Sequence, residues 1–433
     1  MAKILERVVA FHLRNHLAIN NLFDPLQSGF RKFHSTETAL VRVTNDLLMA
    51  SDSGAIFILI LLDLRAAFNT VDHSLLLARL EQDFGVSGTA LKWFKSYFTD
   101  RSQFVSMGGF RSEISPVFTG VPQGSVLGPL LFNIYLAPLG QLLRSLGLHY
   151  HFYADDTQIY IHSKSGEHLD VDFLSGCVSE IKEWMSTNFL CLNSGKTEVM
   201  LIGSRHQISK AGSLSLTIDG SVLATQAKVR NLGVIFDTRL SFDSFVQSTV
   251  KSSFFHLRNI ARLRPMLNFS VAEKLMNSFV ISRIDYCNAL LAGVSKSTLN
   301  KLQYVQNSAA RILTGSRVCN HITPVLESLH WLPVRFRVDF KIMMLTYKAL
   351  HSLAPYYLSE LLTSYTPTRR LRSSQSNLLV VPQTRLRSMG DRAFSSYAPV
   401  LWNSLPPDLR DTQGYDIFKG RLKTYFFKLA FDC

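Results

Sequence analysis

Cysteine is scarce in this chain, and long apolar runs are missing from it. The 433 residues include five widely spaced cysteines without a Cys-x-x-Cys pair. That pattern argues against a disulfide framework or a zinc site and favours reduced thiols. The longest purely apolar run, Ile56–Leu62, is far shorter than the roughly 20 residues that span a bilayer. No cleavable signal pattern opens the chain, so we expect an intracellular protein without a membrane partner.

Acidic residues are scarce in the second half of the chain. From residue 250 onward there are 25 Lys and Arg against 10 Asp and Glu, whereas the preceding part has 21 against 22. This asymmetry predicts a phosphate-backbone partner whose binding weakens with salt, and the alternative is a merely soluble basic surface. A hydrophobic content of 47% excludes wholesale disorder, and the length indicates two or three lobes.

Three carboxylates stand at the ends of predicted strands. Tyr153-Ala154-Asp155-Asp156 lies between His149–Tyr153 and Thr157–Ile161, whose aromatic and β-branched residues predict a hairpin. Asp63 closes the run Ile56–Leu62, which is typical of a buried central strand. Acids near a core repel one another unless divalent cations neutralise them, and oxygen ligands favour Mg²⁺ or Mn²⁺. Because Asp is also a favoured turn residue, the acidic pair alone fits an ordinary turn as well.

A glycine-punctuated loop lies between the two acidic segments. It runs from Thr119 to Pro129 into the predicted helix Leu130–Leu143, and its glycines let the backbone approach a ligand closely. The order of an apolar strand ending in an acid, a Pro-Gln-Gly loop and a Tyr-Ala-Asp-Asp turn resembles the reverse transcriptases of LINE-type, non-LTR retrotransposons, in particular a jockey-like branch. The resemblance covers the chain from about Leu5 to its end. Further segments resemble the fingers, first palm, lysine and primer-grip motifs of that family: Gln27–Leu40, Leu62–His73, Gly195–Glu198 and Asn231–Val234.

The resemblance implies a right-hand polymerase of the α+β class, with an antiparallel-sheet palm, partial fingers, a helical thumb and a helical C-terminal extension. We expect fingers and palm in residues 1–237, the thumb in 238–318 and the basic extension in 319–433. The residue pattern itself also predicts an α+β fold with an antiparallel sheet. Expected helices cover 2–18, 36–52 after the cap candidate Ser35, 74–83, 88–99, 130–143, 169–188 and the region from Ser241; expected strands end at Asp63 and cover 103–119, 149–161, 197–202, 214–223 and 229–236.

The acids would act in two-metal phosphoryl transfer if the resemblance holds. It implies that Asp63 and Asp155 bridge two Mg²⁺ ions, with Mn²⁺ as the alternative. One ion would activate the primer 3′-hydroxyl and the other would hold the triphosphate. The backbone carbonyl of Leu64 would join these ligands, and Asp156 would play a supporting part. The same resemblance makes Leu232 and Gly233 the primer grip.

Five further residues would contact the incoming nucleotide by the same resemblance. Phe68 would block the 2′-hydroxyl, and Gln123 and Gly124 would contact the nascent base pair or the nucleotide. Arg31 would clamp the triphosphate through its planar fork, and Lys196 would neutralise or protonate the leaving pyrophosphate. From the residues alone, Phe68 equally fits a core phenylalanine and Gln123 a polar loop residue. Arg31 and Lys196 equally fit solvated charges.

The implied activity is that of an RNA-directed DNA polymerase, which copies an RNA template from a DNA primer with deoxynucleoside triphosphates. Two positions depart from the family pattern: Asn69 stands where relatives usually have Asp, and Arg65 where a small or amide residue is common. Neither departure removes a metal ligand. The chain starts inside a fingers helix without the family's endonuclease domain, so we expect an N-terminally truncated copy. The alternative is a catalytically inactive nucleic-acid-binding remnant.

The basic half contains two candidate contact regions. Arg258, Arg262 and Arg264 end an amphipathic helix that the resemblance assigns to the thumb, where they would grip duplex phosphates. The alternative is a helix packed on the palm with solvated arginines. The segment Thr366–Arg392, rich in arginine, is a candidate RNA contact. Trp331 and Trp402, each within three residues of a proline, favour packing over base stacking.

Overall fold

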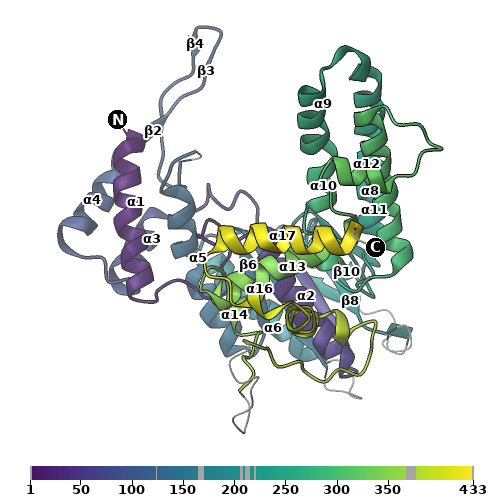
Figure 1. The fold of residues 1–433 in the computed structure, drawn as a ribbon. Coiled ribbons are helices and arrows are strands. Elements are labelled where there is room, and N and C mark those ends of the chain that lie inside the picture. The colour runs from purple at the N-terminus through teal and green to yellow at the C-terminus, as the bar shows by residue number, and fades with distance from the viewer. Residues whose placement is uncertain are drawn as a thin grey trace.

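The computed structural model describes residues 2–122, 124–163, 170–204, 208–209, 215–218, 221–366 and 377–431. Gln123, the basic run Arg369–Arg372 and Cys433 lie outside the described residues. Helices and strands are mixed throughout the first part of the chain, and helices alone follow from residue 243 onward among the named elements (Figure 1). The predicted α+β class with a helical second half is therefore confirmed.

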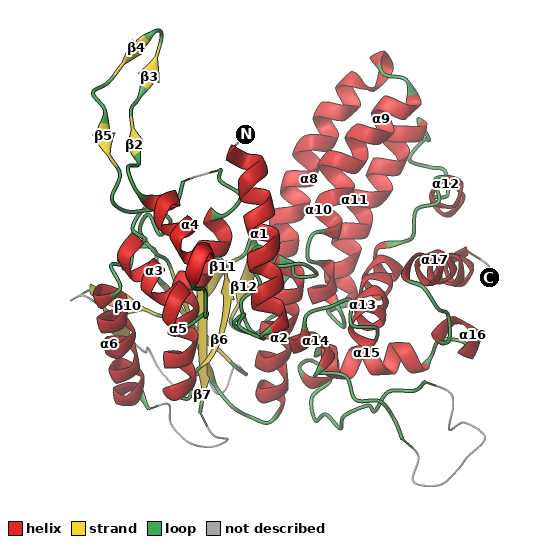
Figure 2. Ribbon diagram, turned by 90° about the vertical axis from the view of Figure 1, so that its left-hand side faces the viewer, coloured by secondary structure: helices red, strands yellow, loops and turns green. Residues whose placement is uncertain are grey.

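A four-stranded antiparallel sheet lies at the centre of the first part (Figure 2). In spatial order its strands are β6 (His149–Tyr153), β7 (Asp156–His162), β1 (Phe57–Leu62) and β8 (Glu198–Ile202). Strand β1 is central, as its apolar run predicts, and alternate residues enter two different cores. Phe57 and Leu59 belong to one core, and Ile58 and Ile60 to the other. Both faces of the sheet are therefore covered.

Five helices build the core that contains Ile58 and Ile60. They are α1 (Ala2–Ile19), α3 (His73–Gln82), α4 (Gly88–Phe98), α5 (Gly128–Ser145) and α6 (Val171–Thr187). Helix α5 is apolar on almost all sides, and eleven of its residues are buried. Such a helix belongs in the interior, and its buried start fixes where the preceding loop ends.

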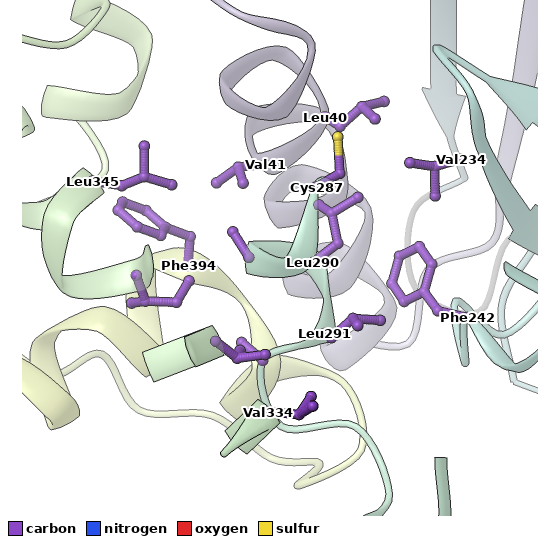
Figure 3. Close-up of a cluster of buried hydrophobic side chains, with 14 of the residues drawn as sticks. Leu40, Val41, Val234, Phe242, Cys287, Leu290, Leu291, Val334, Leu345 and Phe394 are labelled. Carbon is purple, nitrogen blue, oxygen red and sulfur yellow. The ribbon is translucent and has the colours of Figure 1, made fainter. Parts of the chain in front are cut away.

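The other core joins α2 (Thr36–Asp52) to the second half of the chain (Figure 3). In Figure 3, Leu40 and Val41 of α2 lie near Leu290, and Phe394 lies near Leu345. The contributing helices are α8 (Asp243–Leu263), α9 (Phe269–Met276), α10 (Ser282–Asp285), α11 (Lys296–Thr314), α12 (Thr323–Ser328), α13 (Val334–Leu350), α14 (Tyr356–Ser359), α15 (Phe394–Asn403), α16 (Pro407–Arg410) and α17 (Tyr415–Phe431). Short helical turns cover Arg264–Met266, Asn277–Ile281, Asn288–Leu291 and Gly390–Arg392. The division at residues 237 and 318 stays a prediction, but helices after residue 318 pack on α2 as well as on α11.

Two segments that the pattern indicates as continuous strands are hairpins instead. Residues 214–223 contain the paired strands β9 (Ser215–Ile218) and β10 (Ser221–Ala224). Residues 229–236 contain the paired strands β11 (Lys228–Asn231) and β12 (Val234–Asp237). The second hairpin turns at Leu232 and Gly233, whose φ angles of 43° and 85° fit a type I′ turn. Because leucine rarely adopts positive φ, residue preferences do not predict a turn at this position.

The expected strands at 103–119 form a long hairpin that projects from the body at the upper left of Figure 2, whereas α8, α9 and α11 rise at the upper right. It consists of two short ladders. Their strands are β2 (Ser102–Gln103) with β5 (Ser115–Pro116), and β3 (Ser106–Met107) with β4 (Phe110–Arg111).

Local features of the chain agree with its sequence. Ser35 caps α2 and its side chain accepts a hydrogen bond from the backbone of Thr38. Trp331 and Trp402 are 7% and 1% exposed, which confirms packing rather than base stacking. All four cysteines in the described ranges are free thiols. Within those ranges no helix has both the length and the apolar character needed to cross a membrane.

Candidate active site

The acidic turn sits at one end of the sheet, between β6 and β7. Tyr153 pairs with Asp156 across a two-residue loop of Ala154 and Asp155, and Ala154 has a φ of 58°. Positive φ is unfavourable for alanine, so neighbouring contacts must hold this conformation. Gln27 supplies them, because its side-chain oxygen accepts from Ala154 N at 2.9 Å and its side-chain nitrogen donates to Ala154 O at 3.2 Å. The turn is therefore clamped by a residue 127 positions away.

Asp63 is brought to the same end of the sheet by strand register. Leu62 pairs with Thr157 in the antiparallel ladder. One step further toward the same edge of the sheet, Asp63 follows Leu62 and Asp156 precedes Thr157. Asn193 fixes Asp63 twice: its side chain donates to Asp63 Oδ2 at 2.8 Å, and its backbone N donates to Asp63 O at 2.9 Å. Leu64 forms an isolated bridge with Leu192. Strand register therefore brings Asp63 and the acidic turn to one edge of the sheet.

The electrostatics of these acids suit a cation. Burial, followed by the charge of Asp63, raises the pKa of Asp155. Burial and then the charges of Asp155 and Asp63 raise the pKa of Asp156 to about 6. No ion pair with a basic side chain involves these acids in the described ranges. Among the described residues, the negative charge at this edge therefore has no basic side chain at ion-pair distance.

The described residues contain no group of three or more His, Cys, Asp or Glu side chains close enough to hold a metal ion ready-made. Oxygen is nevertheless the only donor element that these three side chains present. That donor set fits hard divalent cations such as Mg²⁺ and Mn²⁺.

The loop from Thr119 to Pro129 runs beside Phe68. Val121 N donates to Phe68 O at 2.8 Å, and Gly120 N donates to Val71 O at 2.7 Å. Gly120 has a φ of 89°, and a Cβ there would lie 2.9 Å from Asn69 O, so only glycine fits. The Phe68 ring is half-buried and stacks on Phe132 at 4.5 Å between ring centroids. Phe68 thus has core contacts as well as a place beside the loop.

A cavity of about 830 Å³ opens next to this loop. It is lined by Asn69, His73 and Arg101 and by the base of the long hairpin. Gln123 lies outside the described residues, whereas Gly124 has a φ of 78° in the same loop. Asn69, the departure from the family pattern, lines this cavity, and none of the three acids does.

The two basic nucleotide candidates have different surroundings. Arg31 donates to the carbonyls of Asp24 and Gln27 at 2.6 and 3.0 Å, and its guanidinium lies over the Phe23 ring at 4.6 Å. Burial lowers the pKa of Arg31. The guanidinium of Arg31 therefore binds residues just before it in the chain, between Phe23 and Gln27. Lys196 is exposed, and its backbone N donates to Asn193 O at 3.0 Å, in the turn that also holds Asp63.

Leu232 and Gly233 form the tip of the β11–β12 hairpin. Tyr286, at the end of α10, donates from its hydroxyl to Leu232 O at 2.7 Å. A Cβ on Gly233 would lie 3.2 Å from that hydroxyl. The tip is therefore tied to the helical second half of the chain.

The three arginines at and just after the end of α8 have different surroundings. Arg258 and Arg262 are exposed, as a phosphate-binding surface requires. Arg264 is half-buried and donates through two guanidinium nitrogens to Leu313 O at 3.0 and 2.9 Å. Because Leu313 lies in the last turn of α11, Arg264 satisfies a helix-terminal carbonyl. In the basic segment 366–392, Arg385 and Arg387 are exposed, and Arg392 is 8% exposed and bonds backbone carbonyls.

Three residues at this site carry no role in the sequence interpretation. Gln27 and Gly29 grip Ala154, and Asn193 orients Asp63. Gln27 and Gly29 belong to a segment that the family resemblance marks, and Asn193 lies three residues before Lys196. The segment could thus be identified, but not the individual contacts, because their partners are more than 120 residues away.

Comparisons with known proteins give independent information. Residues 1–236 match the family model described as reverse transcriptase (RNA-dependent DNA polymerase). The RNA-directed DNA polymerase from mobile element jockey of Drosophila melanogaster is 25% identical over 73% of this chain and 35% of its own length. The probable RNA-directed DNA polymerase from transposon X-element of the same organism is 26% identical over 73% of this chain and 34% of its own length. The chain therefore spans about a third of the length of these curated relatives, and the jockey-like resemblance is confirmed.

A solved structure is also similar. Telomerase from Candida albicans, in complex with the TWJ fragment of telomeric RNA, matches over 76% of this chain and 55% of that chain. The TM-score is 0.39 and the sequence identity is 13%.

Proposed function

The chain belongs to the reverse transcriptase (RNA-dependent DNA polymerase) family, and from that premise we propose that it is an RNA-directed DNA polymerase. It would extend the 3′-hydroxyl of a DNA primer on an RNA template with deoxynucleoside triphosphates. Each addition forms a bond between the primer O3′ and the α-phosphorus of the nucleotide. It breaks the bond from that phosphorus to the departing pyrophosphate.

One observation supports this proposal above the others. Asp63, Asp155 and Asp156 come from two separated segments to one edge of the sheet, and no basic side chain pairs with them in the described ranges. Burial and mutual repulsion raise the pKa values of Asp155 and Asp156. This repulsion between buried charges lowers the stability of the folded chain, and such perturbed ionisable groups are typical of a functional site.

Asp63, Asp155 and the carbonyl of Leu64 would hold two Mg²⁺ ions, with Asp156 in support and Mn²⁺ as an alternative. Bound divalent ions supply charge stabilisation for a phosphoryl group and an acidified primer hydroxyl. Asn193 would orient the Asp63 carboxylate, and the Gln27 clamp would fix Asp155 through Ala154. Phe68 would limit the space beside the sugar, and Gly124 and Gln123 would lie along the nascent base pair. Arg31 and Lys196 as phosphate contacts, and Leu232 and Gly233 as the primer grip, complete the proposed site.

The decisive test is primer extension by the purified chain on an RNA template, with deoxynucleotides and Mg²⁺. Asp155→Asn keeps size but removes the charge, and we expect extension to fall by at least about 100-fold, since a metal contributes several kcal/mol. Asp416→Asn, an exposed acid in α17, is the matched control and should extend at the wild-type rate. Without metal, Asp155→Asn should be at least as stable as wild type, because it relieves repulsion.

Equal extension by wild type and Asp155→Asn would refute the proposed site. Binding of template-primer without any extension would refute the polymerase and leave the inactive nucleic-acid-binding remnant. That alternative is not favoured, because all three acids are present and both the matching family model and the similar curated proteins are described as RNA-dependent or RNA-directed DNA polymerases.

A further inference from the structure

A tyrosine from the last part of the chain packs on His151, in the strand that leads into the acidic turn. Tyr357 is in α14, beyond the residues that match the family, and is 1% exposed. Its backbone is fixed on α2, because Arg42 Nη1 donates to Tyr357 O at 2.9 Å. Arg42 also forms ion pairs with Asp46 and with Glu360, just after α14. The short helix is therefore docked firmly on the first half of the molecule.

The Tyr357 hydroxyl joins a buried hydrogen-bonded chain with a fixed direction. It donates to Thr38 Oγ1 at 3.0 Å, while the Thr38 hydroxyl donates to Ser35 O at 2.9 Å. Because each hydroxyl has one proton, Ser28 Oγ donates to the Tyr357 oxygen at 2.8 Å. Ser28 Oγ is then free to accept from His151 Nε2, also at 2.8 Å. Ser28 and His151 are 1% and 0% exposed.

This chain keeps one protonation pattern over the working pH range. Burial raises the pKa of Tyr357 to about 12. Burial, followed by nearby positive charge, lowers the pKa of His151 to about 3. Both groups are thus neutral near pH 7, and the Tyr357 hydroxyl acts as a permanent link between α14 and Ser28.

Ser28 sits between the two residues that grip the acidic turn. The backbone N of Ser28 donates to the backbone O of Phe152, a residue of strand β6, at 2.8 Å. On one side, Gln27 bonds both the N and the O of Ala154. On the other side, Gly29 packs so closely that a Cβ there would lie 2.8 Å from Ala154 Cα. Any shift of Ser28 therefore reaches Ala154, the residue bonded to Asp155.

We propose that Tyr357 is a positioning residue for the acidic turn: its hydroxyl anchors Ser28, and through Gln27 and Gly29 this anchor sets the position of Asp155. The last part of the chain then has a role in nucleotide addition that is separate from its positive charge. This role rests on the proposed polymerase function, but the structural link itself can be measured without activity.

The test compares Tyr357→Phe, which removes only the hydroxyl, with Tyr356→Phe, its exposed neighbour in the same helix. Primer extension is measured well below the unfolding temperature, so that each variant is fully folded. For Tyr357→Phe we expect kcat to fall about tenfold, with the KM for nucleotide and template-primer within about twofold, since misplacement affects the chemical step. Hydrogen exchange at the Ala154 amide, which Gln27 protects, should speed up about tenfold. Tyr356→Phe should match wild type in both measurements.

Ser28→Ala breaks the same link from its other side and serves as the second variant. It should reproduce both effects, and the double variant should lose no more kcat than either single variant, because the residues act through one contact. A Tyr357→Phe variant with wild-type kcat overturns the proposal, even if it unfolds more easily. Unchanged exchange at Ala154 also overturns it. If the wild type adds no nucleotide, the polymerase function fails, and the exchange experiment alone decides whether Tyr357 positions the turn.

Discussion

Replacement of Gly29 by alanine is the sharpest probe of the clamp on the acidic turn. Gly29 lies outside the left-handed region, so its backbone admits alanine without strain. The new Cβ, however, would lie 2.8 Å from Ala154 Cα and nearer still to its backbone nitrogen. Carbon atoms in contact are about 3.5 Å apart or more, so the two segments must separate by at least about 0.7 Å. The new Cβ would meet the backbone N and the Cα of Ala154, which cannot rotate away as the end of a flexible side chain could.

Two consequences of this separation can be measured. Overpacking of this kind costs about 1–3 kcal/mol in the free energy of unfolding, which urea denaturation would resolve. A displacement of this size beside Asp155 should lower kcat by about 10- to 100-fold. Both effects should appear together, because the same backbone atoms carry them.

Gly176→Ala is the matched control for Gly29→Ala. Gly176 lies within α6, and a Cβ there would meet nothing within 4 Å. Alanine in a helix interior is about 0.5–1 kcal/mol more stable than glycine, so this variant should gain stability and keep its kcat. A Gly29→Ala chain with undiminished stability and full kcat would refute the close contact and the clamp.

Two further predictions follow from buried groups elsewhere. His151 has a folded pKa of about 3, below the unfolded value of about 6.5, so its stability contribution is complete above pH 6.5 and is lost as pH falls toward 3. Urea denaturation should show unfolding free energy about 2 kcal/mol lower at pH 5 than at pH 7 from this group alone, and an identical pH dependence in His151→Gln would contradict it. Asp52 is buried at the end of α2 and accepts from the backbone N of Arg385, Leu386 and Gly390 at 2.8, 2.6 and 3.3 Å. Asp52→Ala should cost about 3 kcal/mol or more by leaving these donors unpaired, and a loss below about 1 kcal/mol in denaturation would show that water replaces the carboxylate.

The sequence by itself determined the features that depend on near neighbours. The run Ile56–Leu62 predicts a central strand, because a strand buried on both faces is apolar at every position. The residues around Asp155 predict a hairpin, and Ser35 predicts the start of α2, since capping involves only the next three residues. Ordered motifs also identified the family, and they predict the three acids as site residues. These predictions agree with strands β1, β6 and β7 and with α2.

The type I′ turn at Leu232 and Gly233 shows where local reasoning fails. Leucine has no intrinsic preference for positive φ, so the segment 229–236 predicts one strand. In the structure, the hydrogen bond from Tyr286 to Leu232 O helps to hold a turn there. A contact 54 residues away thus favours the turn over the local preference.

Only the tertiary structure decided which side chains support the acids. Gln27 and Asn193 are separated from the residues they hold by 127 and 130 positions, and Tyr357 lies 329 positions after Ser28. In the sequence, Arg31 and Arg264 are both candidates for binding phosphate. In the structure, each donates instead to a backbone carbonyl of the protein. Residue type states what a side chain can bond. Which bond it makes depends on packing, because burial leaves a polar group only the partners that the fold brings to it.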